Sequence, residues 1–166
     1  VMRTELWEKG MKEGVESTFS EDGSLIEERN YHENLLDGTD TTYFSSGQIL
    51  EKRVYASGLL SGSYESFFED GTKRCESTYL QGVLQGRSLE WWPNGSIKTI
   101  SFWTNGLLHT AGASHGYSLF NDEGTLIEQR DYIGGQPHGK HQRWHSNGLL
   151  SMTVQWVMGQ KEGCQE

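Results

Sequence analysis

The sequence predicts an all-β protein, an elongated single-layer antiparallel β-meander built of about six 24-residue hairpin repeats. Three observations predict it. A skeleton of glycines and aromatic residues returns every 24 residues along nearly the whole chain, and a period of about 20–50 residues is the signature of a repeat architecture. Between the glycines, side chains alternate in character with a period of two, which is typical of strands. Nothing in the sequence sustains a helical period.

Four columns define the repeat. A glycine opens it, an aromatic residue follows five places later, a second glycine nine places later and a second aromatic residue seventeen places later. In that order the columns are Gly14, Gly38, Gly62, Gly86, Gly139 and Gly163; Phe19, Tyr43, Phe67, Trp91, Phe120 and Trp144; Gly23, Gly47, Gly71, Gly95, Gly124 and Gly148; and Trp7, Tyr31, Tyr55, Tyr79, Trp103, Tyr132 and Trp156.

The columns also set the expected domain organisation. Residues 1–166 are expected to form a single repeat domain, in which residues 1–13 are a degenerate N-terminal repeat. Residues 14–162 hold six repeats, interrupted by a short insertion at 110–114, after which His115 takes the place of the opening glycine. Residues 163–166 begin a partial repeat.

Each repeat is expected to contain a strand, a tight turn, a second strand and a longer connection. Asp-Gly and Asn-Gly accept positive φ and therefore favour two-residue hairpin turns. Pro93 precedes one such turn and Pro137 stands in a longer connection, so neither proline is expected inside a strand. The predicted tight turns are Asp22-Gly23, Asp70-Gly71, Asn94-Gly95 and Asn147-Gly148, with Ser46-Gly47 and Glu123-Gly124 in the same place.

After the tight turn, glutamate and arginine recur two places apart. Because alternate residues of a strand share a face, these side chains are expected to form surface ladders of opposite charge, each weakly stabilising. The pairs are Glu27 with Arg29, Glu51 with Arg53, and Glu128 with Arg130.

The repeat resembles the MORN-repeat family in its bacterial-type variant, whose repeats have two aromatic residues, a variable residue, asparagine and glycine, then a strand, a tyrosine and a glycine. Three segments carry the resemblance: 91–95 (Trp-Trp-Pro-Asn-Gly), 67–71 (Phe-Phe-Glu-Asp-Gly) and 43–47 (Tyr-Phe-Ser-Ser-Gly). The resemblance implies a protein-binding function, since members of the variant are often labelled antitoxins. Other MORN proteins are scaffolds that hold a partner peptide in the groove of a curved sheet, or sit at membranes.

Net charge is −9 and is unevenly placed. Residues 1–85 carry 16 acidic and 8 basic side chains, a balance of −8, and residues 86–166 carry 7 and 6, a balance of −1. Nucleic acid and anionic lipid have the same sign, so neither is expected as a partner. A basic protein, such as a basic toxin, fits the charge better.

The chain has no apolar run of transmembrane length, and residues 1–13 show no signal peptide. Cys75 and Cys164 are expected to lie too far apart to bridge, which fits a reducing compartment. We therefore expect a cytoplasmic protein, with a removed leader left open.

No catalytic, cofactor-binding or metal-binding residues are predicted. The sequence shows no nucleophile with a partnered base and no phosphate-cradling loop. His141 and His145 would share a strand face, but roughly 13 Å apart, too far for one ion. The chain is accordingly expected not to be an enzyme.

A candidate partner site comes from a second aromatic residue that follows the first only in the middle repeats. It is Phe44, Phe68 and Trp92, with Tyr64 beside it and the acidic Glu65, Glu69 and Asp70 nearby. Apolar surface confined to part of a repeat array marks a binding site, while the alternative is that these rings simply cover the back of the sheet.

Taken together, the sequence predicts a non-enzymatic protein-binding repeat module. The first hypothesis is an antitoxin or immunity-type protein that binds and masks a partner protein. The alternative is a structural scaffold, membrane-proximal or cytoskeletal, that holds a partner peptide along its sheet.

Overall fold

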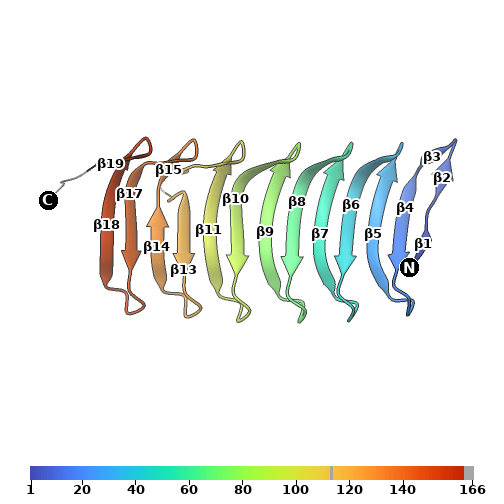
Figure 1. Cartoon of the computed structure of the whole chain (residues 1–166), viewed down its shortest axis with the longest axis horizontal. Helices are drawn as coiled ribbons and strands as arrows, with labels where there is room; N and C mark the ends of the chain where they lie inside the picture. Colours follow the sequence, from blue (N-terminus) through green and yellow to red (C-terminus); the bar gives the residue numbers. More distant parts are fainter. Residues whose placement is uncertain (113, 163–166) are drawn as a thin grey trace. The chain divides into compact units, whose positions relative to one another are not determined.

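The computed structural model describes residues 1–112 and 114–162. Every regular element in them is a β-strand (Figure 1). None of these residues belongs to a helix capable of crossing a bilayer. The partial repeat predicted at 163–166, with Cys164, lies outside the described residues, as does residue 113 of the predicted insertion.

The chain divides into two compact units, unit 1 (Val1–Val83) and unit 2 (Leu84–Glu166). Unit 1 holds an antiparallel sheet in the order β1-β4-β5-β6-β7-β8-β9, beside a small hairpin of β2 (Trp7–Glu8) and β3 (Met11–Lys12). The strands of the sheet are β1 (Met2–Thr4), β4 (Gly14–Phe19), β5 (Leu25–His32), β6 (Leu35–Tyr43), β7 (Ile49–Ala56), β8 (Leu59–Phe67) and β9 (Lys73–Leu80).

Unit 2 repeats this plan in the order β10-β11-β13-β14-β17-β18-β19. Its strands are β10 (Val83–Trp91), which begins one residue before the unit, β11 (Ile97–Thr104), β13 (Tyr117–Phe120), β14 (Leu126–Arg130), β17 (Gly139–Trp144), β18 (Leu150–Val157) and β19 (Gln160–Glu162). The short β12 (Leu107–Leu108) pairs with β11, and β15 (Tyr132–Ile133) pairs with β16 (Gln136–Pro137). Sequence neighbours are sheet neighbours within each unit, which confirms the predicted meander of hairpin repeats. The expectation of a single domain stays a prediction.

The tight turns lie at the opposite end of the hairpins from the one predicted. Gln81 and Gly82 both have positive φ, 50° and 80°, the pattern of a two-residue type I′ turn. Asp70-Gly71 instead lies in a wider loop, in which Gly71 N–H donates to the Phe68 carbonyl and Phe68 N–H to that of Thr72. Only the glycine there has positive φ, because the Asp70 carboxylate accepts the Thr72 N–H and holds the loop as a type I turn with a glycine bulge.

Pro137 is a second correction, because it lies in β16 and pairs with Tyr132. The strand is only two residues long and belongs to a two-stranded sheet, so it has one neighbouring strand, β15, and is an edge strand. Proline is tolerated in such an edge position because the missing N–H breaks no interior hydrogen bond.

The two-residue turns tie successive repeats together. In unit 1, Gly58 N–H donates to the Leu36 carbonyl at 2.8 Å and Gly82 N–H to the Leu60 carbonyl at 2.7 Å. In unit 2, Gly135 N–H makes the equivalent bond to Leu108 at 2.9 Å. Each turn is thus anchored on the strand that follows the previous turn, so the repeats stack in one fixed register.

The interior of each unit is mostly polar. Among the described residues, Leu89 and Tyr132 are the buried apolar side chains, 9% and 8% exposed, whereas Ser66 is 0% exposed and Glu16 2%. A one-layer sheet has no opposing layer, so small polar residues are covered by the longer side chains beside them. We call the face that carries the second aromatic column the tyrosine face; in unit 1 it comprises, among others, Tyr31, Tyr55, Tyr64 and Tyr79.

A comparison of two glycines distinguishes the effect of backbone strain from that of side-chain crowding. Gly82 has φ +80° and open space where a methyl group would lie, while at Gly62, φ +142°, a Cβ would lie 2.8 Å from Val54 Cβ. We expect Gly82→Ala to lower the unfolding free energy by about 1–2 kcal/mol, the cost of a left-handed L-residue. Gly62→Ala should cost clearly more, because overlap adds to strain. Urea unfolding of both variants tests this, and equal losses would contradict it.

Candidate functional site

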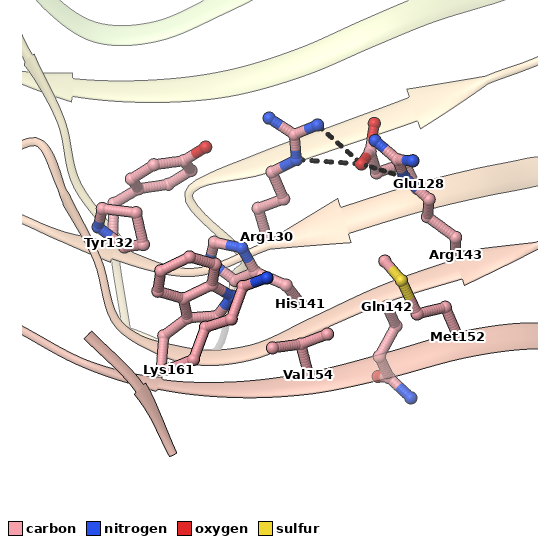
Figure 2. Close-up of a pocket in the computed structure, with 11 residues that line it drawn as sticks. Glu128, Arg130, Tyr132, His141, Gln142, Arg143, Met152, Val154 and Lys161 are labelled. Carbon is pink, nitrogen blue, oxygen red and sulfur yellow. Dashed lines mark hydrogen bonds and ion pairs between the residues drawn. The ribbon is translucent and has the colours of Figure 1, made fainter. Parts of the chain in front are cut away.

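Unit 2 has a cleft of about 240 Å³ on its tyrosine face (Figure 2). Strands β14, β15, β17, β18 and β19 each contribute side chains to it. Alternation along the strands brings these side chains to one face, since residues two apart point the same way. The cleft has an aromatic wall and a cationic wall.

The aromatic wall is a stack of three rings. His141 lies between Tyr132 and Trp156, with ring centroids 5.5 Å away on either side and the planes tilted by 46° and 39°. The His141 Nε2–H donates to the Asp131 carbonyl at 2.8 Å, which fixes the orientation of the imidazole because a carbonyl can only accept. Tyr132 and His141 are each 8% exposed, so two of the three rings are buried at the floor of the cleft.

The cationic wall is organised by Glu128. One of its carboxylate oxygens, Oε1, accepts from Arg130 Nη2 and Arg143 Nε, each at 2.7 Å, and from Arg130 Nε at 2.9 Å (Figure 2). Burial alone would raise the pKa of Glu128, but the hydrogen bonds from Arg143 and Arg130 outweigh it, so the pKa is lowered. Lys161 completes the wall, with its Nζ 5.5 Å from the centre of the Trp156 ring.

The cleft arises where unit 2 departs from the repeat. Two of its lining residues differ from their counterparts in unit 1: His141 stands in the column that holds Glu16, Asp40 and Tyr64, and Arg143 in the column of Thr18, Thr42 and Ser66. A histidine therefore replaces the acidic residues of the first two repeats, and a guanidinium replaces a small hydroxyl side chain.

The residues predicted from sequence as a partner site lie on different surfaces. Tyr64 is on the tyrosine face of unit 1, where its hydroxyl donates to Glu51 at 3.0 Å and its ring meets Tyr79 edge-on, 6.3 Å between centroids. Glu65, the next residue in β8, faces the other side and pairs with Lys73 at 2.7 Å. Tyr64 and Glu65 thus do not share one surface.

The remaining predicted residues lie in the wide loops. Phe44 and Phe68 are half-buried, while Glu69 and Asp70 are exposed beside Phe68. Trp92, in unit 2, donates its indole N–H to the Phe120 carbonyl at 3.1 Å. Lys98 Nζ lies 4.9 Å from the centre of the Trp92 ring. Trp92 therefore ties its loop to the end of β13. Both the binding role of this set and the covering alternative stay predictions.

Sequence reasoning did not single out Arg143, Trp156 or Lys161, and it considered His141 only as a metal ligand and rejected that role. Across residues 1–112 and 114–162, the structure groups no three histidine, cysteine or acidic side chains as a metal site. A signal for two of these residues was present in the repeat columns: His141 and Arg143 differ from the residues that earlier repeats carry at the same positions.

Comparison with known proteins adds one match. A family profile described as MORN repeat variant matches residues 12–33, which contain β4 and β5. No curated protein matches the chain.

The lowered pKa of Glu128 predicts a loss of stability in acid. Ionised Glu128 stabilises the fold above the ordinary carboxyl pKa of 4.5, and this contribution disappears as pH falls through the lower folded pKa. We expect Glu128→Gln to lower the unfolding free energy most near neutral pH, and its deficit to shrink as the pH falls below about 4.5.

Urea unfolding of parent and variant across the acidic range measures this deficit. Glu123→Gln, in an exposed turn of the same unit, is the control for removing one negative charge. A deficit for Glu128→Gln that does not change with pH would contradict the assignment.

Proposed function

We propose that this chain, which carries MORN repeats of the variant type, is a non-enzymatic module that binds another protein. The observation that carries the proposal is the cleft of unit 2, an open depression with aromatic rings on one side and guanidinium groups on the other. Tyrosine, tryptophan and arginine are the side chains in which protein interfaces are enriched. Their convergence on a rigid sheet suits a segment of a partner chain.

The engagement of Glu128 supports a binding role over catalysis. Two arginines donate to its carboxylate, and the pKa of Glu128 is lowered. A general acid or base needs a proton that it can exchange with substrate, and a carboxylate held ionised by two arginines is poorly suited to this.

The finer proposal is that the protein masks its partner, as an antitoxin or immunity protein does. The charge of residues 1–85, 16 acidic against 8 basic side chains, supports a basic partner, because a negative field speeds the approach of a positive protein. Phe68, Glu69 and Asp70 in one wide loop of unit 1, with Phe44 in the loop before it, would add contacts there.

A scaffold that holds a peptide along the sheet is the second candidate. It is favoured by the aromatic column of the tyrosine face, Tyr31, Tyr55 and Tyr79 in unit 1 and Trp103, Tyr132 and Trp156 in unit 2. Within each unit, these rings offer an extended chain repeated places to pack.

Affinity capture of the full chain from its native host, followed by mass spectrometry, tests the binding proposal. We expect one partner at near-equal stoichiometry. Arg143→Glu should reduce its capture, because the substitution reverses a charge in the cleft. Lys140→Glu makes the same charge change on an exposed residue of the same strand, pointing to the other face, and should leave capture unchanged.

Co-expression separates masking from scaffolding. If the captured partner slows growth when expressed alone, this chain should restore growth. A harmless partner would argue for the scaffold, and failure to capture any stoichiometric protein would argue against a binding module altogether.

A further inference from the structure

In unit 1, Arg29 and Arg53 on the tyrosine face each lie between two carboxylates. Arg29 contacts Glu27 at 2.6 Å and Glu16 at 4.0 Å. Arg53 contacts Asp40 at 3.4 Å and pairs with Glu51. Glu16 and Asp40 are almost fully buried, 2% and 3% exposed, so the repeat supplies its own counter-charges from within the sheet.

In unit 2, the cations outnumber the carboxylates. Arg130 has one carboxylate, Glu128, and shares it with Arg143. On the neighbouring strands, Tyr117 and His141 occupy the places that carboxylates hold around Arg29. Lys161 adds a third cation, and no carboxylate among the described residues lies within ion-pair distance of it. With three cations and one carboxylate, the lining has a charge of 3 − 1 = +2, in a chain whose net charge is −9.

We propose that the cleft of unit 2 binds a carboxylate side chain in an acidic segment of the partner protein. The incoming carboxylate supplies to Arg143 and Lys161 the counter-charge that Glu16 and Asp40 supply internally in unit 1. This inference rests on the proposed function in taking the occupant to be a protein.

A carboxylate is the group that this wall fits. Arg143 uses only its Nε toward Glu128, so its two terminal nitrogens can face a ligand. A guanidinium and a carboxylate are planar and match in a two-point contact, which makes arginine selective for carboxylates over single-point acceptors. The side chain of Arg143 is 54% exposed, so a ligand reaches it without opening the sheet.

The aromatic wall argues for a peptide over a free anion. Trp156 and Val154 present half-buried apolar surface beside the cations, and Met152 presents more, 40% exposed. A small anion would leave that surface in water, whereas an aliphatic or aromatic side chain flanking the carboxylate would cover it. The cleft therefore selects an acidic residue with an apolar neighbour.

The test is an NMR titration of the ¹⁵N-labelled full chain with the capped peptide Ser-Gly-Leu-Trp-Glu-Asp-Leu-Gly-Ser. The reporter is the indole N–H of Trp156, and Trp103, whose indole is bonded to Ser101, is the internal reference. We expect the Trp156 signal to shift with saturation. The matched peptide with Gln-Asn in place of Glu-Asp should bind about tenfold more weakly, the loss expected for a charge-assisted contact.

Arg143→Gln and Lys161→Gln should each weaken binding of the acidic peptide by about tenfold. Lys140→Gln should leave its affinity unchanged. Both arginine and lysine are exposed enough for these variants to stay folded, which thermal unfolding checks. Equal binding of the two peptides, or no effect of either variant, would overturn the proposal. So would free glutamate that competes at the same concentration as the peptide, or an oligonucleotide that shifts Trp156 when the peptide does not.

The outcome is separable from that of the proposed function. A native partner whose capture is insensitive to Arg143→Gln and Lys161→Gln would leave the binding module standing and remove the carboxylate site. Peptide binding that depends on both residues, with no partner captured, would support the carboxylate site and count against the proposed binding module.

Discussion

The constraint on which this structure depends is that its sheet is a single layer. A sheet one layer deep has nothing above or below it, so apolar side chains cannot be removed from water by a second layer. The described residues accordingly bury serines, threonines, Glu16 and Asp40 far more than leucines. Stability has to come from contacts between successive strands and repeats, as in other repeat proteins. The turn glycines that donate to the preceding repeat and the arginines that bridge neighbouring strands are the two recurring forms of that contact.

The same constraint explains where a binding site can arise. In a globular fold, a cavity can form between layers, but here any recess must be built from side chains of different length on one face. Unit 2 does this with His141 in a column that holds Glu16 and Asp40 in unit 1, and with Arg143 in a column that holds Thr18 and Thr42 there. Long side chains at the rim and buried rings at the floor then leave a depression. The candidate site thus lies where side chains depart from the repeat.

The strand order followed from the sequence because period and alternation are local properties that tertiary contacts do not override in a meander. The turns were misassigned for an equally physical reason. Asp70-Gly71 is compatible with both a two-residue turn and a glycine bulge, and the choice is made by the Thr72 contacts and by the bulge between Ser66 and Phe67, which no dipeptide encodes. The pairing of Pro137 with Tyr132 likewise depends on a connection that leaves the main sheet.

The cleft could not be predicted from the sequence. Its shape depends on how deeply side chains are buried on strands far apart in sequence, such as those of Arg130 and Lys161.

The carboxylate–arginine contacts have a consequence for how such a chain can change in length. Duplication or loss of whole repeats keeps every turn in register, so the backbone accepts either. The side chains accept it as well. Removing residues 38–61 from unit 1 would place Arg29 opposite Tyr64 in place of Asp40, and Arg53 already lies opposite Tyr64 in the intact sheet. Arg29 would keep Glu16 and Glu27 as its carboxylate partners. A chain of this kind can therefore shorten or lengthen by whole repeats without leaving its arginines uncompensated.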